Sequence, residues 1–222
     1  AGAALSDALP LLQDEYPGVE ELCARFASPP IRNAGTVGGN LANASPVGDL
    51  APLLLALDAR MGLRQGTTER ELPLADFFLD YQVTARKPGE LLTYVRVPRA
   101  QADQIAVAYK VSKRFDQDIA GLSAAFRATL RAGLLTEVRV AFGGMAKLPK
   151  RAFCVERALE GQPLGEAPLA AAQDALQRDF TPISDVRASA EYRFQVARNL
   201  LRRCFLACAG DPAARGVYRE AR

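Results

Sequence analysis

Histidine and tryptophan are absent from this chain of 222 residues, and methionine and cysteine are rare. The lack of histidine removes the usual general base near neutral pH, the usual zinc ligand and any Ser-His-Asp or Cys-His catalytic arrangement. The four cysteines are Cys23, Cys154, Cys204 and Cys208. They form no Cys-x-x-Cys pair, which argues against an iron–sulfur or zinc site. We expect buried free thiols, as in a reducing cytoplasm.

Long apolar runs and a strong excess of one charge are also missing. Without a tract of about 18 apolar residues, the sequence predicts no membrane span. The start of the chain, AGAALSDALP, lacks the basic and apolar regions of a secretory signal. A net charge of +3 is too small to favour nucleic acid or an acidic membrane as a partner. The length, with 49% apolar and 24% charged residues, indicates a cytoplasmic globular protein of one large or two small domains.

The most informative stretch is 31–57, IRNAGTVGGNLANASPVGDLAPLLLAL, a glycine-rich loop that leads into an apolar run. Gly38 and Gly39 allow the backbone to lie against a ligand, since glycine has no Cβ. We predict that Asp49 caps a helix over 50–57, whose free N–H groups would suit an anionic ligand. The spacing fits neither the G-x-G-x-x-G fingerprint nor the P-loop, and a simple tight connection is the alternative on pattern alone.

Hydrophobic periodicity elsewhere switches between that of helices and that of strands. The predicted helices cover 6–12, 16–26, 50–57, 150–161, 167–180 and 189–209. The predicted strands cover 59–64, 69–74, 91–97, 104–111, 119–130 and 135–142. The first two strands alternate in hydrophobicity and are joined by a Gly-containing turn at 65–68, which predicts a β-hairpin. We expect the last three strands to form a three-stranded antiparallel sheet. The order of strands followed by helices predicts an α+β fold rather than a doubly wound sheet.

A short polar segment, 99–103, follows Pro98 and predicts a domain boundary. It divides the chain into domains at 1–100 and 104–210, followed by a tail at 211–222. In the last predicted helix the apolar stripe consists of Tyr192, Val196, Leu200 and Cys204. The arginines of that helix include Arg193, Arg198, Arg202 and Arg203. We expect these arginines to form a solvated face, with contact to a partner as the alternative.

The run from Arg32 to Asp49, RNAGTVGGNLANASPVGD, resembles the flavin-binding region of the molybdenum hydroxylases. It is most similar to the FAD domain of bacterial xanthine dehydrogenase small subunits, and the flavoprotein subunits of carbon monoxide dehydrogenases share the pattern. The resemblance extends over residues 1–210. It implies the second part of a vanillyl-alcohol-oxidase/PCMH-type FAD-binding domain. A carbon-monoxide-dehydrogenase-flavoprotein-type C-terminal domain, with a three-stranded antiparallel sheet and helices, would follow.

The resemblance also implies which residues contact FAD. They are Phe26, Thr36, Gly38, Gly39, Asn40, Asp49, Leu92 and Lys110. Thr36 and Asn40 would bond phosphate or ribose groups, the glycines would permit close approach, and Asp49 would bind polar parts of FAD or cap its helix. Phe26, Leu92 and Lys110 would surround the ring, where the lysine would stabilise the anionic reduced flavin. Core packing of Phe26 and Leu92, and a solvated Lys110, are the alternatives. None of these residues is a proton-transfer catalyst or a metal ligand.

The function implied by the resemblance is electron transfer in a xanthine dehydrogenase. Hypoxanthine or xanthine would be oxidised at a molybdopterin centre in a large partner subunit of a hetero-oligomer. Electrons would then pass through [2Fe–2S] clusters to FAD and on to NAD. One alternative is the FAD subunit of a carbon monoxide dehydrogenase or another molybdenum hydroxylase with a different acceptor, and a second is a flavin-free assembly module. The family's pyrophosphate loop and iron–sulfur domains are not in this sequence, so we expect a truncated or split chain.

Overall fold

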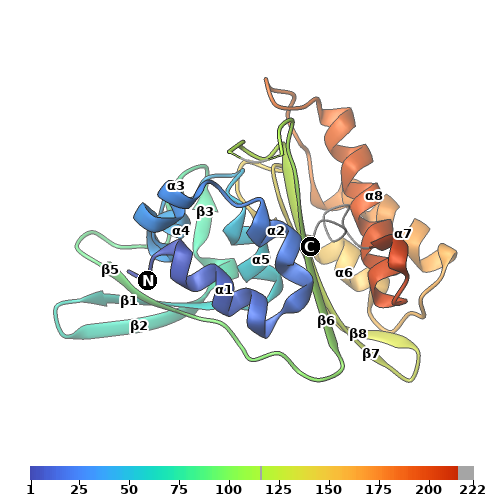
Figure 1. The fold of residues 1–222 in the computed structure, drawn as a ribbon, viewed down its shortest axis with the longest axis horizontal. Helices are drawn as coiled ribbons and strands as arrows, with labels where there is room; N and C mark the ends of the chain where they lie inside the picture. Colours follow the sequence, from blue (N-terminus) through green and yellow to red (C-terminus); the bar gives the residue numbers. More distant parts are fainter. Residues whose placement is uncertain (116, 215–222) are drawn as a thin grey trace.

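The first hundred residues form a layer of short helices beside a small sheet (Figure 1). In this computed structural model, residues 1–115 and 117–214 are described. The helices of this part are α1 (Leu5–Glu15), α2 (Glu20–Ala24), α3 (Pro29–Ala34), α4 (Val37–Ala42) and α5 (Leu50–Ala56), with a 3₁₀ turn at Pro17–Val19. All seven residues of α5 are buried, because this helix is apolar on every side. It packs against the sheet of the second part.

The small sheet confirms the predicted hairpin and the strand that follows it. Its antiparallel strands are β1 (Arg60–Gln65), β2 (Thr68–Pro73) and β5 (Leu91–Arg96), in the order β2-β1-β5. Gly66 takes a φ of 58° in the hairpin turn, a left-handed conformation that glycine adopts without strain. A second, two-stranded pairing joins β3 (Phe78–Asp80) to β4 (Val83–Thr84).

A buried carboxylate fixes the turn that precedes β5. The carboxylate of Glu90 accepts hydrogen bonds from Arg70 Nε at 2.7 Å, Arg70 Nη2 at 2.8 Å and the Lys87 N–H at 2.7 Å. These bonds, the Arg70 pair above all, lower the pKa of Glu90 from 4.5 to about 2. Because the folded-state pKa is depressed, the stabilisation is fully present above pH 4.5 and is lost as the pH falls toward 2.

We therefore expect Glu90→Gln to lower the melting temperature at neutral pH and to flatten its fall on acidification between pH 4.5 and 2. Thermal unfolding monitored by circular dichroism at a series of pH values measures both effects. Glu69→Gln, an exposed position on β2, is the matched control and should keep the acid dependence of the parent. An unchanged acid profile in Glu90→Gln would contradict the assignment.

The second part is a four-stranded antiparallel sheet covered on one face by three helices. Its strands are β6 (Gln104–Val111), β7 (Leu122–Arg131), β8 (Leu134–Gly143) and β9 (Lys150–Arg151), in that order across the sheet. Its helices are α6 (Phe153–Leu159), α7 (Glu166–Asp179) and α8 (Ala190–Cys208). The fold is α+β, as predicted. The sheet has one strand more than predicted, because residues 150–151 pair with β8 instead of starting the helix, and β7 starts at Leu122 rather than at residue 119.

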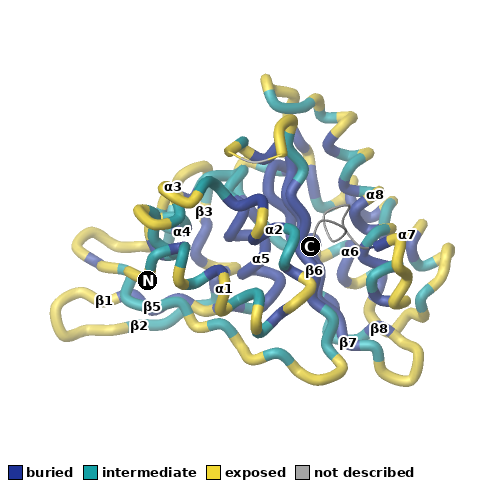
Figure 2. Tube along the Cα trace, viewed as in Figure 1, coloured by how far each residue is buried: buried dark blue, intermediate teal, exposed yellow. Residues whose placement is uncertain are grey.

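The sheet separates two hydrophobic cores, and the size of its side chains alternates between them. Small residues belong to the core shared with α5, among them Ala106, Ala108, Ala125 and Ala141. Larger residues belong to the core shared with α6–α8, among them Val107, Tyr109, Phe126 and Val140. Successive side chains of a strand point to opposite faces, so this alternation lets α5 approach the sheet closely. Figure 2 shows the sheet as the buried layer between the two groups of helices.

The buried face of α8 differs from the predicted stripe. Tyr192 is 52% exposed, whereas Arg193 is only 1% exposed. The Arg193 guanidinium donates to the carbonyl groups of Gly121 and Gly144 and pairs with Asp185, so its charge is compensated inside the fold. The expectation of a solvated Arg193 was therefore wrong.

The remaining predictions concern cysteines, the tail and membranes. The four cysteines are free thiols; Cys23, Cys204 and Cys208 are buried as expected, whereas Cys154 is half-buried. Of the predicted tail, Pro212–Ala214 form a 3₁₀ turn, and residues 215–222 lie outside the described residues. Within 1–115 and 117–214, no helix combines the length and apolar character that a bilayer crossing requires.

Candidate functional site

A cavity of about 620 Å³ lies where the loops of the first part meet the start of the second. Six of the eight predicted contact residues line it together: Phe26, Thr36, Gly39, Asn40, Asp49 and Lys110. They come from the segment after α2, from α4 and its N-cap, from the loop before α5 and from β6. The structure thus brings together residues that lie up to 84 positions apart in the sequence (26 to 110).

A buried ion pair between the two parts of the chain lines this cavity. Lys110 Nζ lies 2.7 Å from Asp49 Oδ2, and the two side chains are 3% and 11% exposed. Burial raises the pKa of Asp49, and the Lys110 charge acts in the opposite direction. Asp49 occupies the N-cap position of α5 but makes no capping hydrogen bond, so the predicted capping role is wrong. The alternative of a solvated Lys110 is excluded by its burial.

Thr36, unlike Asp49, does cap its helix. Its Oγ1 accepts a hydrogen bond from the Gly39 N–H at 3.0 Å, at the start of α4. Asn40, on the same helix, has a buried Oδ1 with no hydrogen-bond partner among the described residues, and the same holds for Asp49 Oδ1. Buried acceptors are normally paired, because an unpaired one costs about 1–3 kcal/mol. The cavity therefore presents two acceptors suited to a ligand with N–H or O–H groups.

Two predicted contact residues do not line the cavity. Gly38 donates its N–H to the Ala1 carbonyl at 2.8 Å, and a Cβ on it would lie 2.8 Å from Ala1 Cβ. Its lack of a side chain is needed for close packing of the chain on itself. Leu92 lies opposite Leu63 in the small sheet and packs against the first hydrophobic core, which is the alternative stated for it.

Arg25 contacts residues of the site and was missed by the sequence analysis, in which its position beside Phe26 is the one available signal. It is 8% exposed, and its Nε donates to the Phe115 carbonyl at 3.0 Å. Its Nη1 donates to the Lys110 carbonyl, and its Nη2 donates to Ser112 Oγ at 2.8 Å. The guanidinium also lies 5.7 Å from the centre of the Phe115 ring. A single side chain of the first part therefore holds the end of β6 and the loop after it.

Asp118 orders the same loop. Its carboxylate accepts hydrogen bonds from the Arg114 N–H at 2.9 Å and from the Ile119 N–H at 3.1 Å. These backbone bonds and the Arg114 side chain lower the pKa of Asp118. Asp118 and Ile119 both line the cavity, so the loop forms one of its walls.

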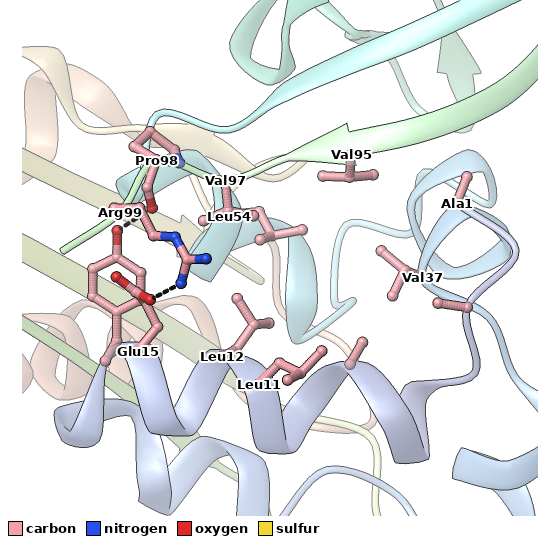
Figure 3. A pocket seen from close by; sticks show the side chains of 13 residues that line it. Ala1, Leu11, Leu12, Glu15, Val37, Leu54, Val95, Val97, Pro98 and Arg99 are labelled. Atoms are coloured by element: carbon pink, nitrogen blue, oxygen red, sulfur yellow. Dashed lines mark hydrogen bonds and ion pairs between the residues drawn. The ribbon is translucent and has the colours of Figure 1, made fainter.

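A second cavity, of about 350 Å³, lies between α1 and β5 (Figure 3). Leu11, Leu12 and Val97 supply part of its apolar lining. At one end Arg99 Nη1 pairs with Glu15 Oε2 at 2.5 Å. The charged groups at its wall are thus paired with each other, and no lining side chain carries a buried unpaired polar atom. We therefore place the functional site at the first cavity.

Phe26, a buried ion pair and two unpaired buried acceptors at one cavity make this α+β chain a candidate for binding a polar ligand with an apolar or aromatic part. Residues 1–100 match the family model described as the FAD binding domain in molybdopterin dehydrogenase. Residues 107–208 match that of the CO dehydrogenase flavoprotein C-terminal domain. The chain therefore belongs to the FAD-binding family of the molybdenum hydroxylases. The predicted domain limits at 100 and 104 remain a prediction.

Individual relatives agree with this family. The nicotinate hydroxylase of Emericella nidulans is 41% identical over 175 residues, which make up 76% of this chain and 13% of that protein. A xanthine dehydrogenase of the same organism is 36% identical over 168 residues, or 74% of this chain and 12% of that protein. A carbon monoxide dehydrogenase structure from Hydrogenophaga pseudoflava has a TM-score of 0.87 at 27% identity, and covers 94% of this chain and 73% of its own. The chain thus spans only a small part of the two curated relatives.

Proposed function

We propose that this chain carries the FAD of a molybdenum hydroxylase and passes electrons from [2Fe–2S] clusters to an acceptor. The observation that carries the proposal is the pair of unpaired acceptors, Asn40 Oδ1 and Asp49 Oδ1, in a cavity that Phe26 and Lys110 also line. In a flavin-free assembly module, these two acceptors would have no cofactor to bind. The residues present therefore fit FAD.

The contacts of the bound cofactor follow from the chemistry of the lining. Asn40 and Asp49 would accept hydrogen bonds from flavin N–H or ribityl hydroxyl groups, and Phe26 would lie against the ring. The charged side chains that line the cavity are Lys110, Asp49 and Asp118, which give no excess of positive charge. We therefore expect the ring and ribityl chain, rather than the diphosphate, to lie here. When bound, FAD would supply the two-electron redox chemistry, and the protein its position and electrostatics.

For the substrate and the electron acceptor, we propose that the molybdenum site of a large partner subunit oxidises hypoxanthine or xanthine, and that NAD accepts the electrons. Iron–sulfur domains would complete a hetero-oligomer in the cytoplasm. The similarity to a xanthine dehydrogenase supports this version. The similarity to a carbon monoxide dehydrogenase structure supports the second candidate, a carbon monoxide dehydrogenase flavoprotein with a different acceptor.

A visible absorption spectrum of the chain with added FAD, together with its intact mass, tests the proposal. We expect bound FAD with a shifted spectrum. A folded chain of the expected mass that leaves FAD free would contradict it. In the complete enzyme, anaerobic addition of xanthine or of carbon monoxide separates the two candidates, since only the true substrate bleaches the flavin. Recovery of the flavin colour on addition of NAD then identifies the acceptor.

A further inference from the structure

Two of the three charged side chains that line the cavity are paired with each other. Lys110 Nζ, from β6, lies 2.7 Å from Asp49 Oδ2, from the loop before α5. Both side chains are removed from water, so their charges are weakly screened. A ligand in the cavity therefore meets a lysine whose positive charge is largely cancelled by its neighbour.

The other charged groups near the cavity are engaged elsewhere. Asp118 is bonded to the backbone and side chain of Arg114, whose side chain is 74% exposed. The guanidinium of Arg25 donates to the carbonyl oxygens of Lys110, near the end of β6, and of Phe115, in the loop after it. The Lys110–Asp49 pair is thus the place where a change of charge acts on a ligand with little screening.

Asp49 has a second feature that points to a ligand. One carboxylate oxygen holds Lys110, whereas Oδ1 is buried without a partner among the described residues. The same residue can therefore fix the position of the lysine and accept a hydrogen bond from a bound molecule. A capping role does not account for its burial, since it makes no hydrogen bond to α5.

We propose that Asp49 is a positioning residue that holds Lys110 in the cavity and limits, through its own charge, the preference of the site for reduced over oxidised flavin. The inference rests on the proposed function. Two-electron reduction of flavin with uptake of one proton adds one negative charge. Lys110 favours that charge and Asp49 opposes it, so the pair sets the ratio of the two affinities.

The test is a redox titration of the purified flavin-loaded protein, with dithionite as reductant and a reference dye, at mildly alkaline pH. Asp49→Asn keeps the shape and an acceptor for Lys110 but removes the negative charge. We expect the affinity ratio, reduced over oxidised FAD, to rise at least tenfold, which is about 30 mV for a two-electron couple. Lys110→Met should lower the ratio at least tenfold, and the double variant should return to within about threefold of the parent.

Asp118→Asn is the matched control, since it removes the same charge from the wall of the same cavity. Its ratio should change less than about threefold, because Asp118 is paired with the solvent-exposed Arg114. An equal rise in both Asn variants would overturn the assignment to Asp49, and so would an unchanged or lower ratio in Asp49→Asn. If Asp49→Asn alone fails to retain FAD, the affinity ratio of the double variant is compared with that of Lys110→Met. The difference between these two ratios measures the effect of the Asp49 charge. A parent protein that binds no FAD would instead refute the proposed function, and this inference with it.

Discussion

Replacement of Arg193 by methionine is expected to lower the free energy of unfolding by about 3–5 kcal/mol. The guanidinium donates to the carbonyl groups of Gly121 and Gly144 and lies 2.7 Å from Asp185. Methionine fills most of the space but removes the guanidinium that bonds the two carbonyls and the charged partner of the Asp185 carboxylate. For a chain of this size, the melting temperature should fall by about 10 °C. Urea denaturation and thermal unfolding measure the two quantities.

Arg198→Met on the same helix is the control for this prediction. Arg198 pairs with Asp174 on the surface, where the side chains are 38% and 77% exposed. Exposed pairs contribute about 0–1 kcal/mol, so this variant should unfold close to the parent. Equal losses of unfolding free energy in the two variants would show that the buried contacts of Arg193 stabilise the fold no more than an exposed ion pair does.

The second large effect is expected at Asn40. Its Oδ1 is buried and unpaired in the cavity, and leucine has a similar size but no acceptor. Loss of a buried hydrogen bond to the cofactor costs about 1–3 kcal/mol, so Asn40→Leu should weaken FAD binding about 10–100-fold. Fluorescence titration with FAD measures the affinity.

Asn33→Leu provides the comparison, since Asn33 is exposed on α3 and does not line the cavity. It should bind FAD as the parent does, and both variants should keep the far-UV circular dichroism of the parent. Unchanged affinity in Asn40→Leu would place the cofactor elsewhere.

Local patterns explain which parts of the fold could be predicted. Strand β6 was predicted with the bounds it has, 104–111, because a run of strand-forming residues lies between polar segments. The hairpin at 60–73 was predicted from alternation and a Gly-containing turn. The short pairing of residues 150–151 with β8 was missed, since its bonds depend on a distant partner.

The site shows the same division between local and long-range information. The resemblance identified six of the residues that line the cavity, yet it did not indicate what they do to one another. Asp49 has the sequence context of a helix cap, and only the folded chain brings it to Lys110. Arg25 and Arg193 look like surface arginines in the sequence, because the carbonyl groups that receive them lie far away along the chain.

The alternation of alanines and larger residues in the β6–β8 sheet bears on how such a protein can change over evolutionary time. The first hydrophobic core includes Ala106, Ala108, Ala125 and Ala141, which belong to strands of the second part. The border between the two family domains is therefore not a border between two cores. If recombination at residues 99–103 replaced the second part by that of a relative, α5 would pack against a different sheet. It would fit only where that sheet also has small side chains on the face toward α5. We expect the two parts to be inherited together and to diversify as one unit.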